Sequence, residues 1–138
     1  MSIAMEDWPR RHRITVDEYH RMAEVGLLAP DARVELIEGA IIDMPPIGSR
    51  HASFVDRLTE LLFVAVAGRA MLRCQGPVQL GDRSEPQPDL ALFVRRKDFY
   101  EHRHPAAADT LLLVEVSETT LRYDRHTKDA SLRTPRHS

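Results

Sequence analysis

The sequence of 138 residues contains a single cysteine, Cys74, so no disulfide can form within the chain. This excludes a small secreted domain held by disulfide bonds and indicates a reducing compartment. No apolar run is long enough to cross a bilayer, since the longest spans residues 61–67. Residues 1–13 are polar and lack the apolar stretch of a signal peptide. We therefore expect a soluble cytoplasmic protein with no membrane partner.

The chain also has little net charge and few aromatic residues. Its formal net charge is −2, and aromatic residues make up 6% of it. A module that binds nucleic acid without chemistry normally has a basic field and aromatic side chains for base stacking, so this alternative is the least favoured. Basic residues do cluster locally, and each cluster fits either a solvated surface or a rim that contacts DNA. The clusters are Arg10, Arg11 and Arg13; Arg95, Arg96 and Lys97; and Arg122, Arg125, Lys128, Arg133 and Arg136.

The first part of the chain predicts a short helix and a β-hairpin. Thr15 and Glu18 have the spacing of a capping box, which predicts a helix over residues 16–25. A tight turn at Glu38-Gly39 separates two β-prone runs, which predict paired strands at residues 33–37 and 40–44.

A long helix follows the hairpin. Ser49 is its expected N-cap, and Gly68 is expected to end it after about Ala67. One face of this helix is expected to pack on a sheet, because apolar residues recur at helical spacing: Phe54, Val55, Leu58, Leu61, Leu62 and Ala65.

The rest of the chain predicts the strands of a mixed sheet, followed by a helix from Thr119 or Thr120. The expected strands are residues 70–75, 77–80, 90–94 and 110–116. The last two are apolar on both faces, which is typical of central strands covered on each side. The chain therefore predicts one α/β domain with a mixed β-sheet flanked by helices.

Three acidic residues lie in apolar surroundings on three of these strands. Glu115 follows four apolar residues, Asp89 precedes another apolar run, and Glu35 alternates with the apolar side chains of the hairpin. A carboxylate in such a place must be neutralised, paired or bound to a cation. Together the three indicate one shared cation, and carboxylate oxygens suit Mg²⁺ or Mn²⁺ better than zinc.

For each of these residues, a structural role is the alternative to metal binding. Glu35 is then an exposed hairpin residue, Asp89 a turn or cap residue, and Glu115 one half of a buried ion pair with Arg73 or Arg122. The histidines at positions 102 and 104 share a polar loop, which does not by itself indicate a metal site.

These residues also carry a family resemblance. Pro88-Asp89 followed by Glu115-Val116-Ser117 resembles the PD-(D/E)xK nuclease superfamily, with serine where that pattern has lysine. The chain is most similar to its Uma-type branch of restriction endonucleases, the DUF820 group. Further matching positions are Thr15 to Tyr19, Glu35 to Gly39, Met44-Pro45, His51, Thr120, Asp124 and Lys128.

The resemblance implies a restriction-endonuclease-like fold and an Mg²⁺-dependent (or Mn²⁺-dependent) endonuclease that hydrolyses DNA phosphodiester bonds. It implies that Asp89 and Glu115 bind the metal ion, with the Val116 carbonyl as a third ligand and Glu35 as a further one. Lys128 takes the role of the missing strand lysine and assists the attacking water, although Asp124 and Lys128 also fit a surface ion pair. His51 contacts the phosphate or orients a carboxylate.

The resemblance divides the chain into an N-terminal extension (1–13), an incomplete nuclease domain (14–128) and an atypical polar tail (129–138). Members of the branch continue with further strands, which this tail does not resemble. Missing strands would leave a sheet edge uncovered and favour self-association, so a homodimer is one expected state. The alternative to an active nuclease is therefore a truncated, inactive remnant that acts as a binding or self-associating domain.

Overall fold

The computed structural model describes residues 8–117, and its first element is the helix α1 (Val16–Glu24). The Thr15 hydroxyl accepts a hydrogen bond from the Glu18 N–H at 3.1 Å, and the Glu18 carboxylate accepts one from the Thr15 N–H at 2.8 Å. The predicted capping box is thus confirmed. The helix buries Val16 and Tyr19 against Leu36 of the following hairpin.

The predicted hairpin is also confirmed, as β1 (Val34–Ile37) paired antiparallel with β2 (Ala40–Asp43). Both residues of its turn have positive φ, 46° at Glu38 and 83° at Gly39, which suits a tight two-residue hairpin. A Cβ atom on Gly39 would lie 2.6 Å from the Cβ of Arg13, so glycine is required there on two grounds.

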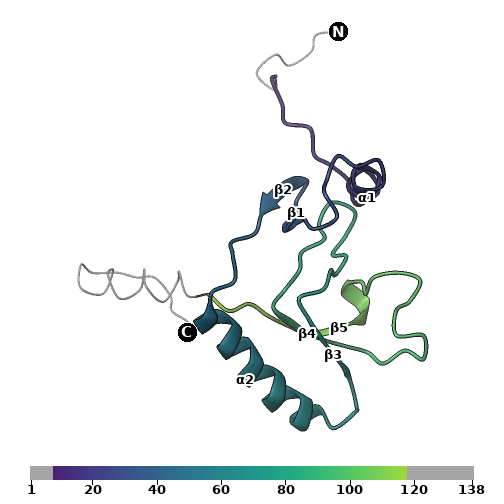
Figure 1. Ribbon diagram of the computed structural model, residues 1–138. Coiled ribbons are helices and arrows are strands. Elements are labelled where there is room, and N and C mark those ends of the chain that lie inside the picture. Colours follow the sequence, from purple (N-terminus) through teal and green to yellow (C-terminus); the bar gives the residue numbers. More distant parts are fainter. Residues whose placement is uncertain (1–7, 118–138) are drawn as a thin grey trace.

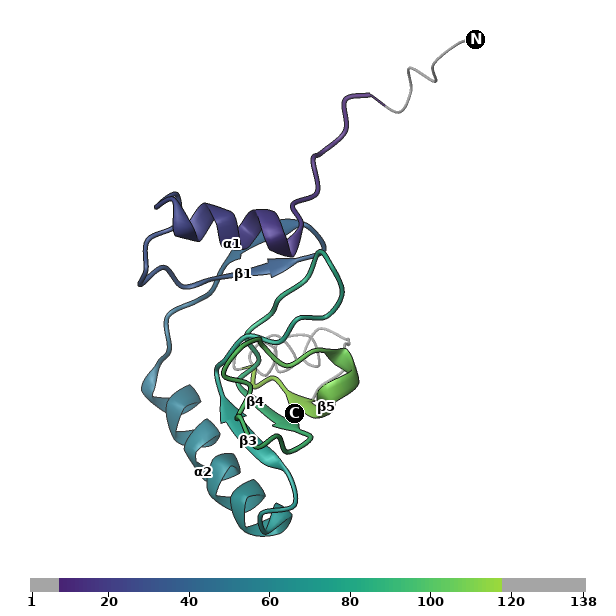
Figure 2. The same ribbon diagram turned by 90° about the vertical axis from the view of Figure 1, so that its right-hand side faces the viewer.

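The long helix α2 (Ser49–Val66) lies beside the strand β3 (Met71–Cys74), as Figures 1 and 2 show. The expected N-cap at Ser49 is wrong: Gly48 is the N-cap, and no side chain caps this end. The prediction that one face of the helix packs on a sheet is confirmed only in part. Val55 is buried, but Phe54 and Leu61 are exposed, because the helix meets the sheet along one edge strand.

A three-stranded antiparallel sheet has the order β3-β4-β5, with β4 (Leu90–Phe93) in the middle and β5 (Thr110–Val114) at its side. Every residue of β4 is buried, as predicted for a central strand. The core on this side of the molecule consists of Met71, Val78, Ala91, Phe93 and Tyr100.

Two strand predictions need correction. Residues 110–116 were expected to be covered on each side, but β5 has a single neighbour within the described chain, and Leu111 is 58% exposed. Residues 77–80 form no strand, because only Gln79 makes a bridge, to Ala106. The predicted helix from Thr119 or Thr120 and the tail at residues 129–138 lie outside the described residues.

The segment between β3 and β4 joins the two parts of the molecule. In Figure 1 it rises from the sheet to the hairpin and α1. Glu85 pairs with Leu36 through two backbone hydrogen bonds, with N–O distances of 2.7 and 3.4 Å. The Gly39 N–H donates to the Arg83 carbonyl, and the Val16 N–H donates to the Asp82 carbonyl. This segment holds the hairpin next to the entrance of β4.

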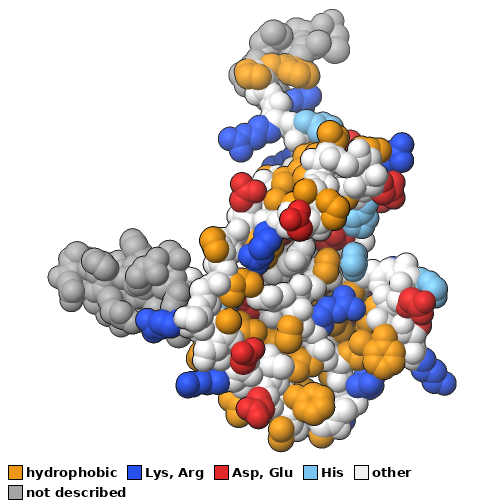
Figure 3. Space-filling view, in the orientation of Figure 1, with side chains coloured by type: hydrophobic (Ala, Val, Ile, Leu, Met, Phe, Trp, Pro, Cys, Tyr) orange, Lys and Arg blue, Asp and Glu red, His pale blue; other side chains and the backbone are white. Residues whose placement is uncertain are grey.

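The surface of the described chain carries exposed apolar side chains (Figure 3). Those on α2 and β5 are Phe54, Leu61, Phe63, Val64, Leu111, Leu112 and Leu113. Even so, none of the helices described is sufficiently long and apolar to span a membrane.

The capping box gives a first prediction. Thr15→Ala should lower the free energy of unfolding by about 1 kcal/mol, because the Glu18 N–H loses its acceptor at the helix N-terminus. Urea denaturation followed by circular dichroism measures this loss. Thr15→Ser keeps the hydroxyl and should match the wild type, so an equal loss in both variants would contradict the assignment.

Candidate metal and catalytic site

Asp89 lies at the entrance of β4 and is buried, with 8% of its surface exposed. Its Oδ1 accepts a hydrogen bond from His51 Nε2 at 2.9 Å, and its Oδ2 accepts one from the Val116 N–H at 2.7 Å. His51 belongs to the first turn of α2, and Val116 follows β5. Asp89 therefore connects the helix, the central strand and the end of the edge strand, which is more than a turn or cap residue does.

Glu115 comes directly after β5, and its carboxylate titrates abnormally. Partial burial, followed by the negative charges of Asp89 and Glu35, raises the pKa of Glu115 to about 7, while His51 opposes the shift. The alternative of an ion pair with Arg73 is wrong: the structure has no ion pair between these two described residues, and the Arg73 guanidinium lies over the Phe93 ring, 5.6 Å from its centroid. Arg122, the other suggested partner, lies outside the described residues.

Glu35 comes from β1 and is half-buried, so it is not an exposed hairpin residue. Its Oε1 accepts a hydrogen bond from the Gln87 N–H at 2.9 Å. Successive side chains of a strand point to opposite faces, so Glu35 points away from the core formed by Leu36 and α1. This orientation directs Glu35 towards the segment that leads into Asp89.

The charges of Asp89, Glu35 and His51 all act on Glu115, and His51 hydrogen-bonds to Asp89. Among the described residues, however, these side chains do not form a group whose donor atoms all lie within 4.8 Å of one another. Within the part of the chain that the structure describes, no lysine or arginine forms an ion pair with any of the three carboxylates. Concentrated negative charge of this kind favours a cation. Lys128, the fourth expected residue, lies outside the described residues.

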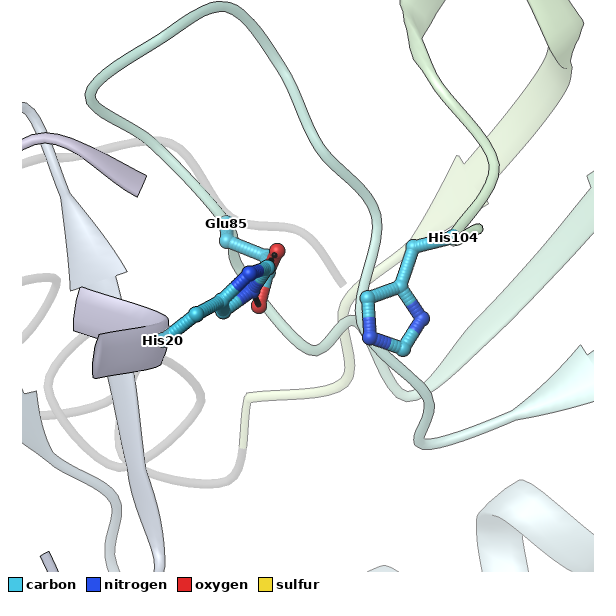
Figure 4. A group of neighbouring side chains, drawn as sticks. All are labelled: His20, Glu85 and His104. Atoms are coloured by element: carbon cyan, nitrogen blue, oxygen red, sulfur yellow. Dashed lines mark hydrogen bonds and ion pairs between the residues drawn. The ribbon is translucent and has the colours of Figure 1, made fainter. Parts of the chain in front are cut away.

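A second group of side chains that could bind a metal ion was not predicted from the sequence, in which no histidine cluster is evident. His20, Glu85 and His104 come from three segments, and one nitrogen or oxygen atom of each lies within 4.8 Å of the others (Figure 4). His104 therefore belongs with two distant residues and not with His102, its neighbour in the loop. No spacing in the sequence signals such a group.

Residues 16–131 match the family Uma2, described as "Putative restriction endonuclease". Among solved structures, the chain is similar to the crystal structure of a "putative nuclease belonging to DUF820" from Anabaena variabilis ATCC 29413. That likeness has a TM-score of 0.53 at 20% identity, and it covers 84% of this chain and 66% of the other. No curated protein matches the chain. The expected fold and family resemblance are confirmed.

The pKa of Glu115 gives a pH prediction. The folded state holds this proton more tightly than the unfolded state, because the pKa rises from the ordinary 4.5 to about 7. In EDTA, the free energy of unfolding should therefore fall as pH rises through that range, and the lost stability should not return at higher pH.

Denaturation at about pH 5 and about pH 8 measures this change, and Glu115→Gln should largely remove it. Glu38→Gln, at an exposed position in the hairpin turn, should behave like the wild type. An unchanged pH dependence in Glu115→Gln would show that another group is responsible.

Proposed function

Since the chain belongs to the Uma2 family, we propose that it is a nuclease that hydrolyses DNA phosphodiester bonds with a divalent metal ion. The observation that carries the proposal is that the charges of Asp89 and Glu35 act on Glu115, while no lysine or arginine of the described chain forms an ion pair with any of the three carboxylates. Burial, and after it the negative charges of Asp89 and Glu35, raises the pKa of Glu115, and a bound cation would favour the ionised form.

The donor set fits a hard cation. Carboxylate oxygens are the ligands of Mg²⁺ and Mn²⁺, and in this proposal Asp89 and Glu115 bind the ion, with Glu35 and the Val116 carbonyl as further ligands. When bound, such an ion polarises a phosphate and lowers the pKa of a water molecule. Each Asp89 oxygen accepts one hydrogen bond within the described chain and keeps a lone pair for the ion.

The chain's own side chains orient this site. The His51 N–H and the Val116 N–H hold the two Asp89 oxygens from opposite elements, so the carboxylate cannot rotate freely. The Gln87 N–H holds one oxygen of Glu35 in the same way. We assign His51 as a positioning residue that acts through Asp89. By resemblance to the family, Lys128 orients the attacking water or stabilises the charge of the transition state.

A second candidate function is a self-associating domain without catalysis. It is favoured by the exposed apolar side chains of α2 and β5, which a second copy of the chain would cover. A monomer by light scattering, with cleavage that depends on Mg²⁺, would exclude it. A folded dimer that does not cleave DNA would favour it over the nuclease.

Plasmid nicking tests the nuclease directly. Purified protein should nick supercoiled DNA with Mg²⁺ or Mn²⁺ and not with EDTA. Asp89→Asn should lower the rate by on the order of 100-fold or more, because a metal ligand supports several kcal/mol of charge stabilisation. Asp31→Asn, at an exposed carboxylate before β1, is the matched control and should retain the rate. Metal-dependent nicking that survives in Asp89→Asn would refute the assigned site.

The role of His51 makes a separate prediction. His51→Ala should lower activity by about 10-fold to 100-fold and raise the Mg²⁺ concentration needed, because Asp89 loses the donor that orients it. His51→Gln keeps an N–H donor and should recover part of both losses. Equal defects in the two variants, with Mg²⁺ dependence unchanged, would exclude a positioning role.

A further inference from the structure

The second group of ligating side chains lies around Glu85. This residue is 4% exposed, and its two carboxylate oxygens lie 3.0 and 2.8 Å from His20 Nε2. No other side chain of the described residues hydrogen-bonds to this carboxylate. A buried carboxylate whose side-chain partner is one imidazole destabilises the folded state unless its charge is compensated.

His104 approaches the same carboxylate from the loop before the short helix η2 (Ala107–Asp109). Its ring is edge-on to the His20 ring, with centroids 6.1 Å apart and planes at 66°. Figure 4 shows Glu85 beside His20, with His104 facing them from the other side. A ring nitrogen of a neutral imidazole is a common metal ligand. The His104 side chain forms no hydrogen bond within the described chain.

We propose that His20, Glu85 and His104 bind one zinc ion, at a site separate from the Asp89 carboxylates. Two imidazoles and one carboxylate are a zinc ligand set, whereas three carboxylates suit magnesium. Around zinc, with bonds of about 2.1 Å, neighbouring ligand atoms lie about 3.4 Å apart. The three donor atoms already lie within 4.8 Å, so side-chain shifts on the order of 1 Å suffice to complete the site.

The backbone pairing separates this site from the first one. Glu85 lies directly opposite Leu36 in an antiparallel pair, and opposite residues point to the same face. Glu85 therefore points with Leu36 towards α1, where His20 lies. Glu35, the neighbour of Leu36 on β1, points to the other face. The two groups of donors thus occupy opposite faces of the same pairing.

In this proposal the zinc ion links three separate segments of the chain. His20 belongs to α1, Glu85 to the segment before β4, and His104 to the loop before β5. Three protein ligands leave the fourth position to water. Bound zinc neutralises the Glu85 carboxylate and fastens α1 and the hairpin to the sheet, so its main effect is on stability.

Zinc titration of the whole chain tests this site. Protein stripped with chelator is titrated with Zn²⁺ by calorimetry against a competing chelator, and its Tm is followed. Asp89→Asn serves as the background, because it weakens any zinc binding at the carboxylates. One Zn²⁺ should bind in this background and raise Tm. His104→Ala should weaken binding on the order of 100-fold and abolish the rise in Tm, since a lost ligand costs several kcal/mol.

His102→Ala is the matched control from the same loop, and it should bind Zn²⁺ as the background does. His104→Ala should leave the Tm of the metal-free protein unchanged. If His104→Ala does not fold, His20→Ala removes another of the three ligands and replaces it in the test. The site is refuted if Zn²⁺ does not bind, if Asp89→Asn alone abolishes binding, or if His104→Ala binds as tightly as His102→Ala. None of these outcomes bears on DNA cleavage, which is measured separately.

Discussion

Two backbone hydrogen bonds between Leu36 and Glu85 are the contact on which the rest of the structure depends. They attach the segment before β4 to the hairpin and so join α1, β1 and β2 to the three-stranded sheet. They also set the direction of the neighbouring side chains, because alternate residues of a strand point to opposite faces. Glu35 is directed towards Asp89 and Glu85 towards His20, so both groups of ligating side chains depend on one pairing.

The carboxylate site is a local source of instability within this frame. Burial and the charges of Asp89 and Glu35 disfavour the ionised form of Glu115, and this is the form that binds a cation. The cost is offset by the capping box of α1 and by the buried side chains around β4. Sites that gather like charges commonly rely on stability supplied elsewhere in the fold.

The predictions that proved correct depend on residues close together in the chain. The capping box spans Thr15 to Glu18, and the hairpin turn requires a positive φ that Gly39 accepts without strain. Two of the predictions that failed depend on what covers a surface. An apolar run does not reveal whether its strand is central or at an edge, so the exposure of β5 could not be predicted. Similarly, α2 has more apolar residues than its contact with β3 buries.

The sequence by itself determined the local elements, and it marked Glu35, Asp89 and Glu115 as carboxylates out of keeping with their surroundings. Only the tertiary structure decided which residues meet. The hydrogen bond from His51 to Asp89 spans 38 residues, that from Gln87 to Glu35 spans 52, and that from His20 to Glu85 spans 65. A sequence pattern records the period of a helix or strand, which concerns neighbours in the chain. Contacts between distant segments form when the two parts of the molecule pack together. No local sequence pattern specifies which distant segments will meet.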